Sequence, residues 1–119
     1  MLPEHIDPAV HDTIARHRGK VLISVASIWE MAQKHRRGRW PEVAAIVADP
    51  AGQIAAEGMT PLPVTLQHAS LAGMLAWEHR DPFDRMLAAQ AIAEDATLVT
   101  ADRAFAFVPA KAALRTLWA

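Results

Sequence analysis

Short apolar runs alternate along the chain with stretches in which apolar residues recur every three or four positions. The run Val21-Leu22-Ile23-Ser24 is typical of a strand buried on both faces. Further short strands are expected at residues 61–65, 97–100 and 113–118. Helices are expected at residues 1–20 (ended by Gly19), 27–37, 41–58 (two short helices broken at Asp49-Pro50), 67–77 and 82–95. This alternation predicts an α/β fold, a short parallel β-sheet flanked by helices.

The helix over residues 82–95 has the clearest beginning. Asp81 is placed to cap it, Pro82 suits its first position, and Asp84 falls in its first turn, where the helix dipole favours a carboxylate. Asp102 comes just after the next strand, and ligands of α/β sheets bind at the carboxyl ends of the strands. Asp-Pro-x-Asp is also simply a good helix start, so this motif alone does not establish a site.

Glu30 has two interpretations. With Ser27 it matches a capping box at the start of the helix over residues 27–37, and it also lies beyond the end of a strand, as Asp102 does. The basic segment at the end of that helix, residues 34–40, also has two interpretations. In the first interpretation, its cations interact with the negative end of the helix dipole at the C-terminus of the helix. In the second, Arg36 and Arg37 bind RNA phosphates while Trp40 stacks on a base. His68 and His79 are interpreted as local hydrogen-bonding residues.

Composition limits the possible functions. The 119 residues, 52% hydrophobic and 21% charged, suit one globular domain spanning 1–119. A net charge of −1 gives no overall attraction to nucleic acid, and the absence of Cys excludes disulfides and thiolate chemistry. No membrane-spanning run, signal peptide or glycine-rich nucleotide loop is recognised, so a cytoplasmic protein is expected.

The candidate chemistry lies in three carboxylates. Glu30, Asp84 and Asp102 come from segments that a parallel sheet would gather at one edge. Oxygen ligands without thiolate suit Mg²⁺ or Mn²⁺ rather than Zn²⁺. Such ions activate water and neutralise charge in phosphodiester cleavage.

Three stretches of the sequence resemble a known family. Val21–Lys34, His79–Ala91 and Leu98–Asp102 are similar to PIN-domain ribonucleases, specifically the VapC toxins of type II toxin–antitoxin systems. The resemblance implies a Mg²⁺- or Mn²⁺-dependent endoribonuclease that cuts RNA, forms a homodimer and is bound by a VapB-like antitoxin, which places an Arg among the carboxylates. It implies metal-binding and catalytic roles for Glu30, Asp84 and Asp102, and supporting roles for Ser24, Asp81 and Thr100.

The sequence departs from that family at its start. Family members begin with a central strand ending in Asp-Thr-His, and Met1 falls after that point. We therefore expect that this chain lacks the first strand and the first catalytic acid, so that the alternative is an inactive remnant that still binds an antitoxin or another subunit. A receiver-like signalling domain is disfavoured because Lys111 matches its late Lys but its acidic pair and central phosphoacceptor are absent.

Overall fold

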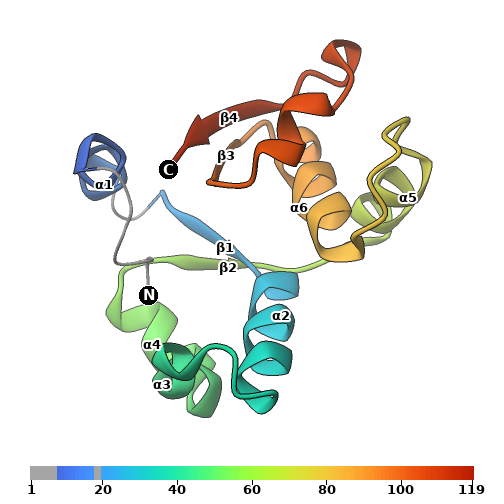
Figure 1. Ribbon diagram of the computed structural model, residues 1–119. Helices are drawn as coiled ribbons and strands as arrows, with labels where there is room; N and C mark the ends of the chain where they lie inside the picture. The colour runs from blue at the N-terminus through green and yellow to red at the C-terminus, as the bar shows by residue number, and fades with distance from the viewer. Residues whose placement is uncertain (1–7, 18–19) are drawn as a thin grey trace. The chain divides into compact units, whose positions relative to one another are not determined.

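The computed structural model describes residues 8–17 and 20–119, and the chain forms two compact units, Met1–Pro63 and Val64–Ala119. The first unit contains helices α1 (Pro8–Arg16), α2 (Val25–Arg36), α3 (Ala44–Ala48) and α4 (Pro50–Ala56), the 3-10 turn η1 (Pro41–Val43), and strands β1 (Leu22–Ser24) and β2 (Thr60–Leu62). The second contains helices α5 (Leu66–Met74) and α6 (Pro82–Ala93), strands β3 (Thr97–Thr100) and β4 (Arg115–Trp118), and the 3-10 turns η2 (Arg103–Phe107) and η3 (Ala110–Ala112) (Figure 1). Within the described part of the chain, no helix has both the length and the apolar character needed to cross a bilayer.

Each unit contains one pair of parallel strands. β1 pairs with β2 from Leu22↔Thr60 to Ser24↔Leu62, and β3 pairs with β4 from Thr97↔Arg115 to Thr100↔Trp118. A parallel pair needs a long crossover connection; α2, η1, α3 and α4 lie between β1 and β2, and the 3-10 turns η2 and η3 lie between β3 and β4. The predicted α/β class and the parallel pairing are confirmed. The part of the predicted first helix that falls on residues 1–7 and 18–19 lies outside the described residues.

The core of the first unit forms where α2, α3 and α4 meet β1. Five buried apolar residues make up this core: Ile23, Met31, Val43, Ile46 and Ile54. The predicted break at Asp49-Pro50 is confirmed. Pro50 is the first residue of α4, and the Asp49 carboxylate accepts a hydrogen bond from the Gly52 N–H at 3.2 Å, so the break is a capped helix start.

The predicted start of the helix after β1 is wrong. α2 begins at Val25, and its cap is Ser24, whose hydroxyl oxygen accepts from the Ala26 N–H at 3.1 Å. Ser27 and Glu30 therefore lie inside the helix, and the capping box expected between them does not begin it. Ser24 occupies the point where the extended strand ends, and its own hydroxyl satisfies an orphan N–H three residues earlier than the sequence motif suggested.

Helix α5 in the second unit begins with an unusual reciprocal cap. The Thr65 hydroxyl accepts from the His68 N–H at 3.2 Å, and His68 Nδ1 accepts from the Thr65 N–H at 3.1 Å. An accepting Nδ1 carries no hydrogen, so the hydrogen of the neutral ring lies on Nε2, which meets Glu94 Oε2 at 3.1 Å. The local hydrogen-bonding role predicted for His68, which is 1% exposed, is confirmed.

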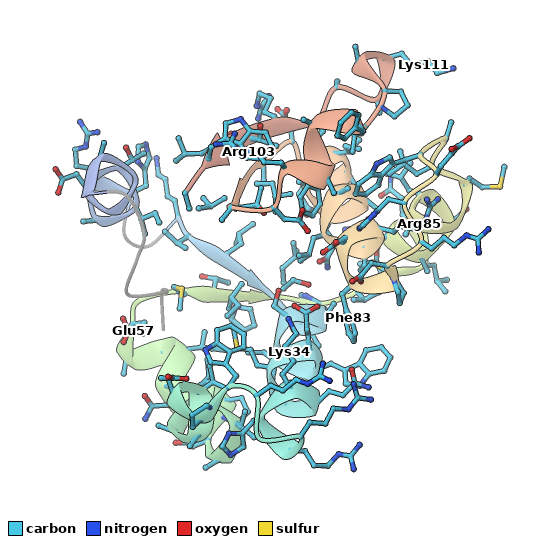
Figure 2. The ribbon with its side chains drawn as sticks, viewed as in Figure 1. Lys34, Glu57, Phe83, Arg85, Arg103 and Lys111 are labelled. Carbon is cyan, nitrogen blue, oxygen red and sulfur yellow. The ribbon has the colours of Figure 1, made fainter. Side chains whose placement is uncertain are left out.

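Helix α5 ends at Met74, earlier than predicted, because the following segment is bound by Arg85. This side chain extends from α6 (Figure 2), and its guanidinium donates to five carbonyl oxygens: those of Ala72, Gly73, Leu75, Trp77 and His79. Trp77 is consequently not on the helix but in the loop, where it is buried with Leu75, Ala88 and Phe105 in the core of the second unit. One cation thus satisfies the end of α5 and fixes the loop leading to α6.

We expect Arg85→Ala to lower the free energy of unfolding by about 3 kcal/mol or more, because it leaves several partly buried carbonyls unpaired. Arg85→Lys should recover little, since an ammonium cannot reproduce the planar fork of donors. Arg80→Ala, an exposed cation of the same loop, is the matched control. Denaturant unfolding measures all three, and equal effects of the changes at 80 and 85 would contradict the assigned role.

Candidate metal centre

The beginning of α6 places Asp84. The Asp81 carboxylate accepts from the N–H groups of Phe83 (2.9 Å) and Asp84 (3.3 Å), and Pro82 is the first residue of the helix. The predicted cap is confirmed. Asp84 is therefore held in the first turn, at the positive end of the helix dipole.

The end of β3 places Asp102. The Thr100 hydroxyl accepts from the Asp102 N–H at 3.0 Å, and Asp102 Oδ1 accepts from the Ala104 N–H at 2.9 Å, which caps the turn η2. The backbone and one carboxylate oxygen of Asp102 are thus both fixed. An exposed carboxylate held in this way keeps acceptor capacity for a cation.

The two carboxylates meet a histidine. His79, Asp84 and Asp102 each offer one ligand atom, and these atoms lie within 4.8 Å of one another. The closest approach is between His79 Nε2 and Asp84 Oδ2, at 2.6 Å. His79 comes from the loop bound by Arg85, Asp84 from α6 and Asp102 from the segment after β3, so three separate segments contribute to the cluster.

Asp84 is in an environment that disfavours its charge. Burial raises the pKa of its carboxyl above the usual value of 3.8; the hydrogen bond from His79 opposes this shift, and the negative charges of Asp81 and Asp102 add to it. Its side chain is only 15% exposed. A divalent cation would relieve both the desolvation and the repulsion, so the residues present fit such an ion.

Of the three predicted ligands, the structure brings Asp84 and Asp102 together in the second unit. Glu30 belongs to the first unit, on α2, where its carboxylate lies 3.8 Å from Lys34 Nζ. Its participation as a ligand stays a prediction. Thr100 and Asp81 make hydrogen bonds beside Asp102 and Asp84, and Ser24 caps α2; the supporting roles of these three residues stay predictions.

His79 is the residue of this cluster that the sequence did not mark as a ligand. It was expected to make local hydrogen bonds, and the bond to Asp84, five positions along, confirms that. A His shortly before an Asp-Pro helix start was the signal available. Nothing local indicated that the loop would return its ring to the first turn of the helix.

At the basic end of α2, the arginines are exposed to solvent and the indole ring is packed against the core. Arg36 and Arg37 are exposed, whereas Trp40 packs against the core of the first unit, with Lys34 Nζ 5.9 Å from its ring centroid. RNA contact by Arg36, Arg37 and Trp40 stays a prediction. The arginines are better placed for it, because the packed indole has less surface for a base.

Comparison with known proteins gives a family and a fold. Residues 3–111 match the PIN domain family. A chain of the crystal structure of DNA-bound VapBC from Salmonella typhimurium superposes with a TM-score of 0.71 at 20% sequence identity, covering 96% of this chain and 86% of that one. No curated protein matches the sequence significantly.

We expect Asp84→Asn to raise the melting temperature of the metal-free protein at neutral pH. A raised pKa means that the folded state binds the proton more tightly, so the contribution of Asp84 to stability is full below its unfolded pKa and is lost as pH rises through the folded pKa. As pH rises from the unfolded pKa of Asp84 to its folded pKa, the free energy of unfolding of the wild type should therefore fall, and that of the variant should fall less. Mg²⁺ or Mn²⁺ should stabilise the wild type more than the variant.

Thermal melts from pH 3 to pH 7, with and without the ion, measure this difference. Asp95→Asn is the matched control, since Asp95 is an exposed acid of the same unit, paired with Arg115 at 2.8 Å. A wild type and Asp84→Asn variant with parallel pH profiles would contradict the electrostatic account.

Proposed function

The chain belongs to the PIN-domain family, and from this membership we propose that it is a VapC-like toxin, a metal-dependent endoribonuclease of a type II toxin–antitoxin system. The observation that carries the proposal is the approach of Asp84 and Asp102 within 4.8 Å at the start of α6 and the end of β3. Catalysis and metal binding are assigned to these two acids together with Glu30. The similarity to a chain of a VapBC complex supports the toxin class.

The metal-ligating side chains of this site suit hydrolysis of a phosphodiester. Asp84 and Asp102 would hold Mg²⁺ or Mn²⁺, and the bound ion would supply charge neutralisation and water activation. The chain's own part is to keep the acids in place. Asp81 caps the turn that contains Asp84, and Thr100 holds the backbone of Asp102. The acids are thereby set before substrate arrives.

The proposed substrate is RNA in the cytoplasm. With a net charge of −1, the protein gains phosphate affinity only from local cations, and Arg36 and Arg37 at the exposed end of α2 are the assigned contacts.

The proposed partner is a VapB-like antitoxin bound to a toxin homodimer. A partly buried carboxylate with a raised pKa, beside a second carboxylate, favours any cation that can be delivered to it. An arginine is suited because its guanidinium binds carboxylates through two parallel hydrogen bonds and does not lose its charge. The antitoxin would therefore inhibit by occupying the place of the metal. The VapBC complex from Salmonella typhimurium is bound to DNA, which suits a partner with a DNA-binding part.

We expect Mn²⁺- or Mg²⁺-dependent cleavage of RNA that excess chelator abolishes. Asp84→Asn and Asp102→Asn should each reduce the rate by more than about 100-fold, because loss of a direct ligand exceeds the effect of losing an outer partner. Asp95→Asn should cleave like the wild type. Gel analysis of a labelled RNA pool gives the rates, and cleavage that persists in chelator would contradict the metal mechanism. No cleavage by a folded wild type that binds an antitoxin would favour the inactive alternative.

Co-expression with a small DNA-binding protein encoded next to this chain should yield a stable complex. We expect Asp84→Ala/Asp102→Ala to weaken it by at least about tenfold, since an arginine of the partner would lose its carboxylates. Binding is measured by titration calorimetry, with Asp95→Ala as the control. Unchanged affinity of the double variant would place the antitoxin elsewhere.

A further inference from the structure

The histidine beside the two acids is held more firmly than a surface histidine needs to be. The rings of His79 and Trp77 stack with centroids 4.7 Å apart and planes 29° apart. Trp77 is itself buried, with its ring centroid 5.4 Å from that of Phe105. The His79 carbonyl accepts from Arg85 Nη1 at 3.0 Å. The ring is therefore fixed through its face and through its backbone, independently of its contact with Asp84.

The direction of the ring matters as much as its rigidity. Nε2 faces Asp84 Oδ2 at 2.6 Å, and a ligand atom of Asp102 lies within the same 4.8 Å group. In the structure this nitrogen and oxygen are hydrogen-bonded to each other. A neutral imidazole can instead carry its single hydrogen on Nδ1, which leaves the Nε2 lone pair directed at the carboxylates. The loop thus presents a nitrogen donor to the site at which the acids present oxygens.

We propose that His79 is a direct ligand of the metal, so that the centre combines one imidazole nitrogen with carboxylate oxygens and prefers a first-row transition ion to Mg²⁺. This inference rests on the proposed function, because it concerns the ion bound by Asp84 and Asp102. Mg²⁺ takes oxygen ligands almost exclusively, whereas imidazole is a good ligand for transition metals. A nitrogen donor within 4.8 Å of both acids therefore shifts the preference of the site.

The competing role is that of a positioning residue. His79 would then only donate a hydrogen bond that orients the Asp84 carboxylate, as residues around metal ligands commonly do. Both roles predict that a change at His79 lowers cleavage, so cleavage does not distinguish them. The identity of the atom bonded to the ion does.

The decisive measurement is pulsed electron paramagnetic resonance of the full chain loaded with Mn²⁺. The protein is prepared with ¹⁵N only in its histidines, and hyperfine coupling to ¹⁵N reports a histidine nitrogen bonded to the ion. We expect this coupling in the wild type and its loss in His79→Gln, whose amide can still donate a hydrogen bond to Asp84. His17→Gln, the same change at an exposed histidine of the first unit, should leave the coupling intact.

Affinities give a second readout. Calorimetry should show that His79→Gln weakens Mn²⁺ binding by about tenfold or more and Mg²⁺ binding much less, because only the transition ion gains from nitrogen. If His79→Gln does not fold, His79 is identified by elimination: the ¹⁵N coupling of the wild type must survive the change to Gln at each of the other five histidines of the chain, His5, His11, His17, His35 and His68.

The outcomes separate the two proposals. Mn²⁺ that binds in an Asp84-dependent way without any ¹⁵N coupling would overturn ligation by His79 and leave the proposed nuclease intact. A wild type that binds no Mn²⁺ and cleaves RNA in excess chelator would overturn the proposed metal mechanism, and this inference with it.

Discussion

The second unit depends on the reach of one guanidinium. Arg85 leaves α6 in its first turns and meets carbonyls from Ala72 to His79, so the end of α5 and the loop that follows are fixed by one side chain. This is the reason that Trp77 enters the core and His79 lies beside Asp84. Arginine is suited to the position because its five N–H donors form a rigid, permanently charged fork.

The start of α6 also contains an electrostatically unfavourable group, the Asp84 carboxylate. Asp84 is largely buried, and Asp81 and Asp102 surround it with like charge, so the fold gives up stability at this point. Such a cost is characteristic of sites that bind a cation, since the arrangement that repels without an ion attracts when one arrives. On the proposed function, a metal ion and an arginine of the antitoxin would compete for the same negatively charged site around Asp84.

Short polar caps divide the chain into its elements. In residues 20–119, the side chains that accept hydrogen bonds at the start of the following helix or 3-10 turn are those of Ser24, Asp49, Thr65, Asp81 and Asp102. Two of them, Ser24 and Asp102, lie at or just beyond the end of a strand, where the chain must turn within one or two residues. At Asp102 the cap uses one carboxylate oxygen, so a structural role and a binding role coexist in a single side chain.

The sequence by itself determined the features that depend on a few neighbouring residues. These are the Asp81-Pro82 start of α6, the break at Asp49-Pro50 and strand β3, each set by a cap, a proline or a short apolar run. It misplaced the start of α2, because Ser24 and Ser27 both suit a cap and only the end of β1 decides between them.

Only the tertiary structure decided what lies beside Asp84. The turn that returns His79 to α6 follows no sequence pattern; it is set by backbone carbonyls that Arg85 binds and by the burial of Trp77 against Phe105. Carbonyls are common to all residues and are invisible in a pattern of side chains. The sequence could therefore name Asp84 and Asp102 as acids of one site, but the nitrogen that completes the cluster follows from contacts between segments.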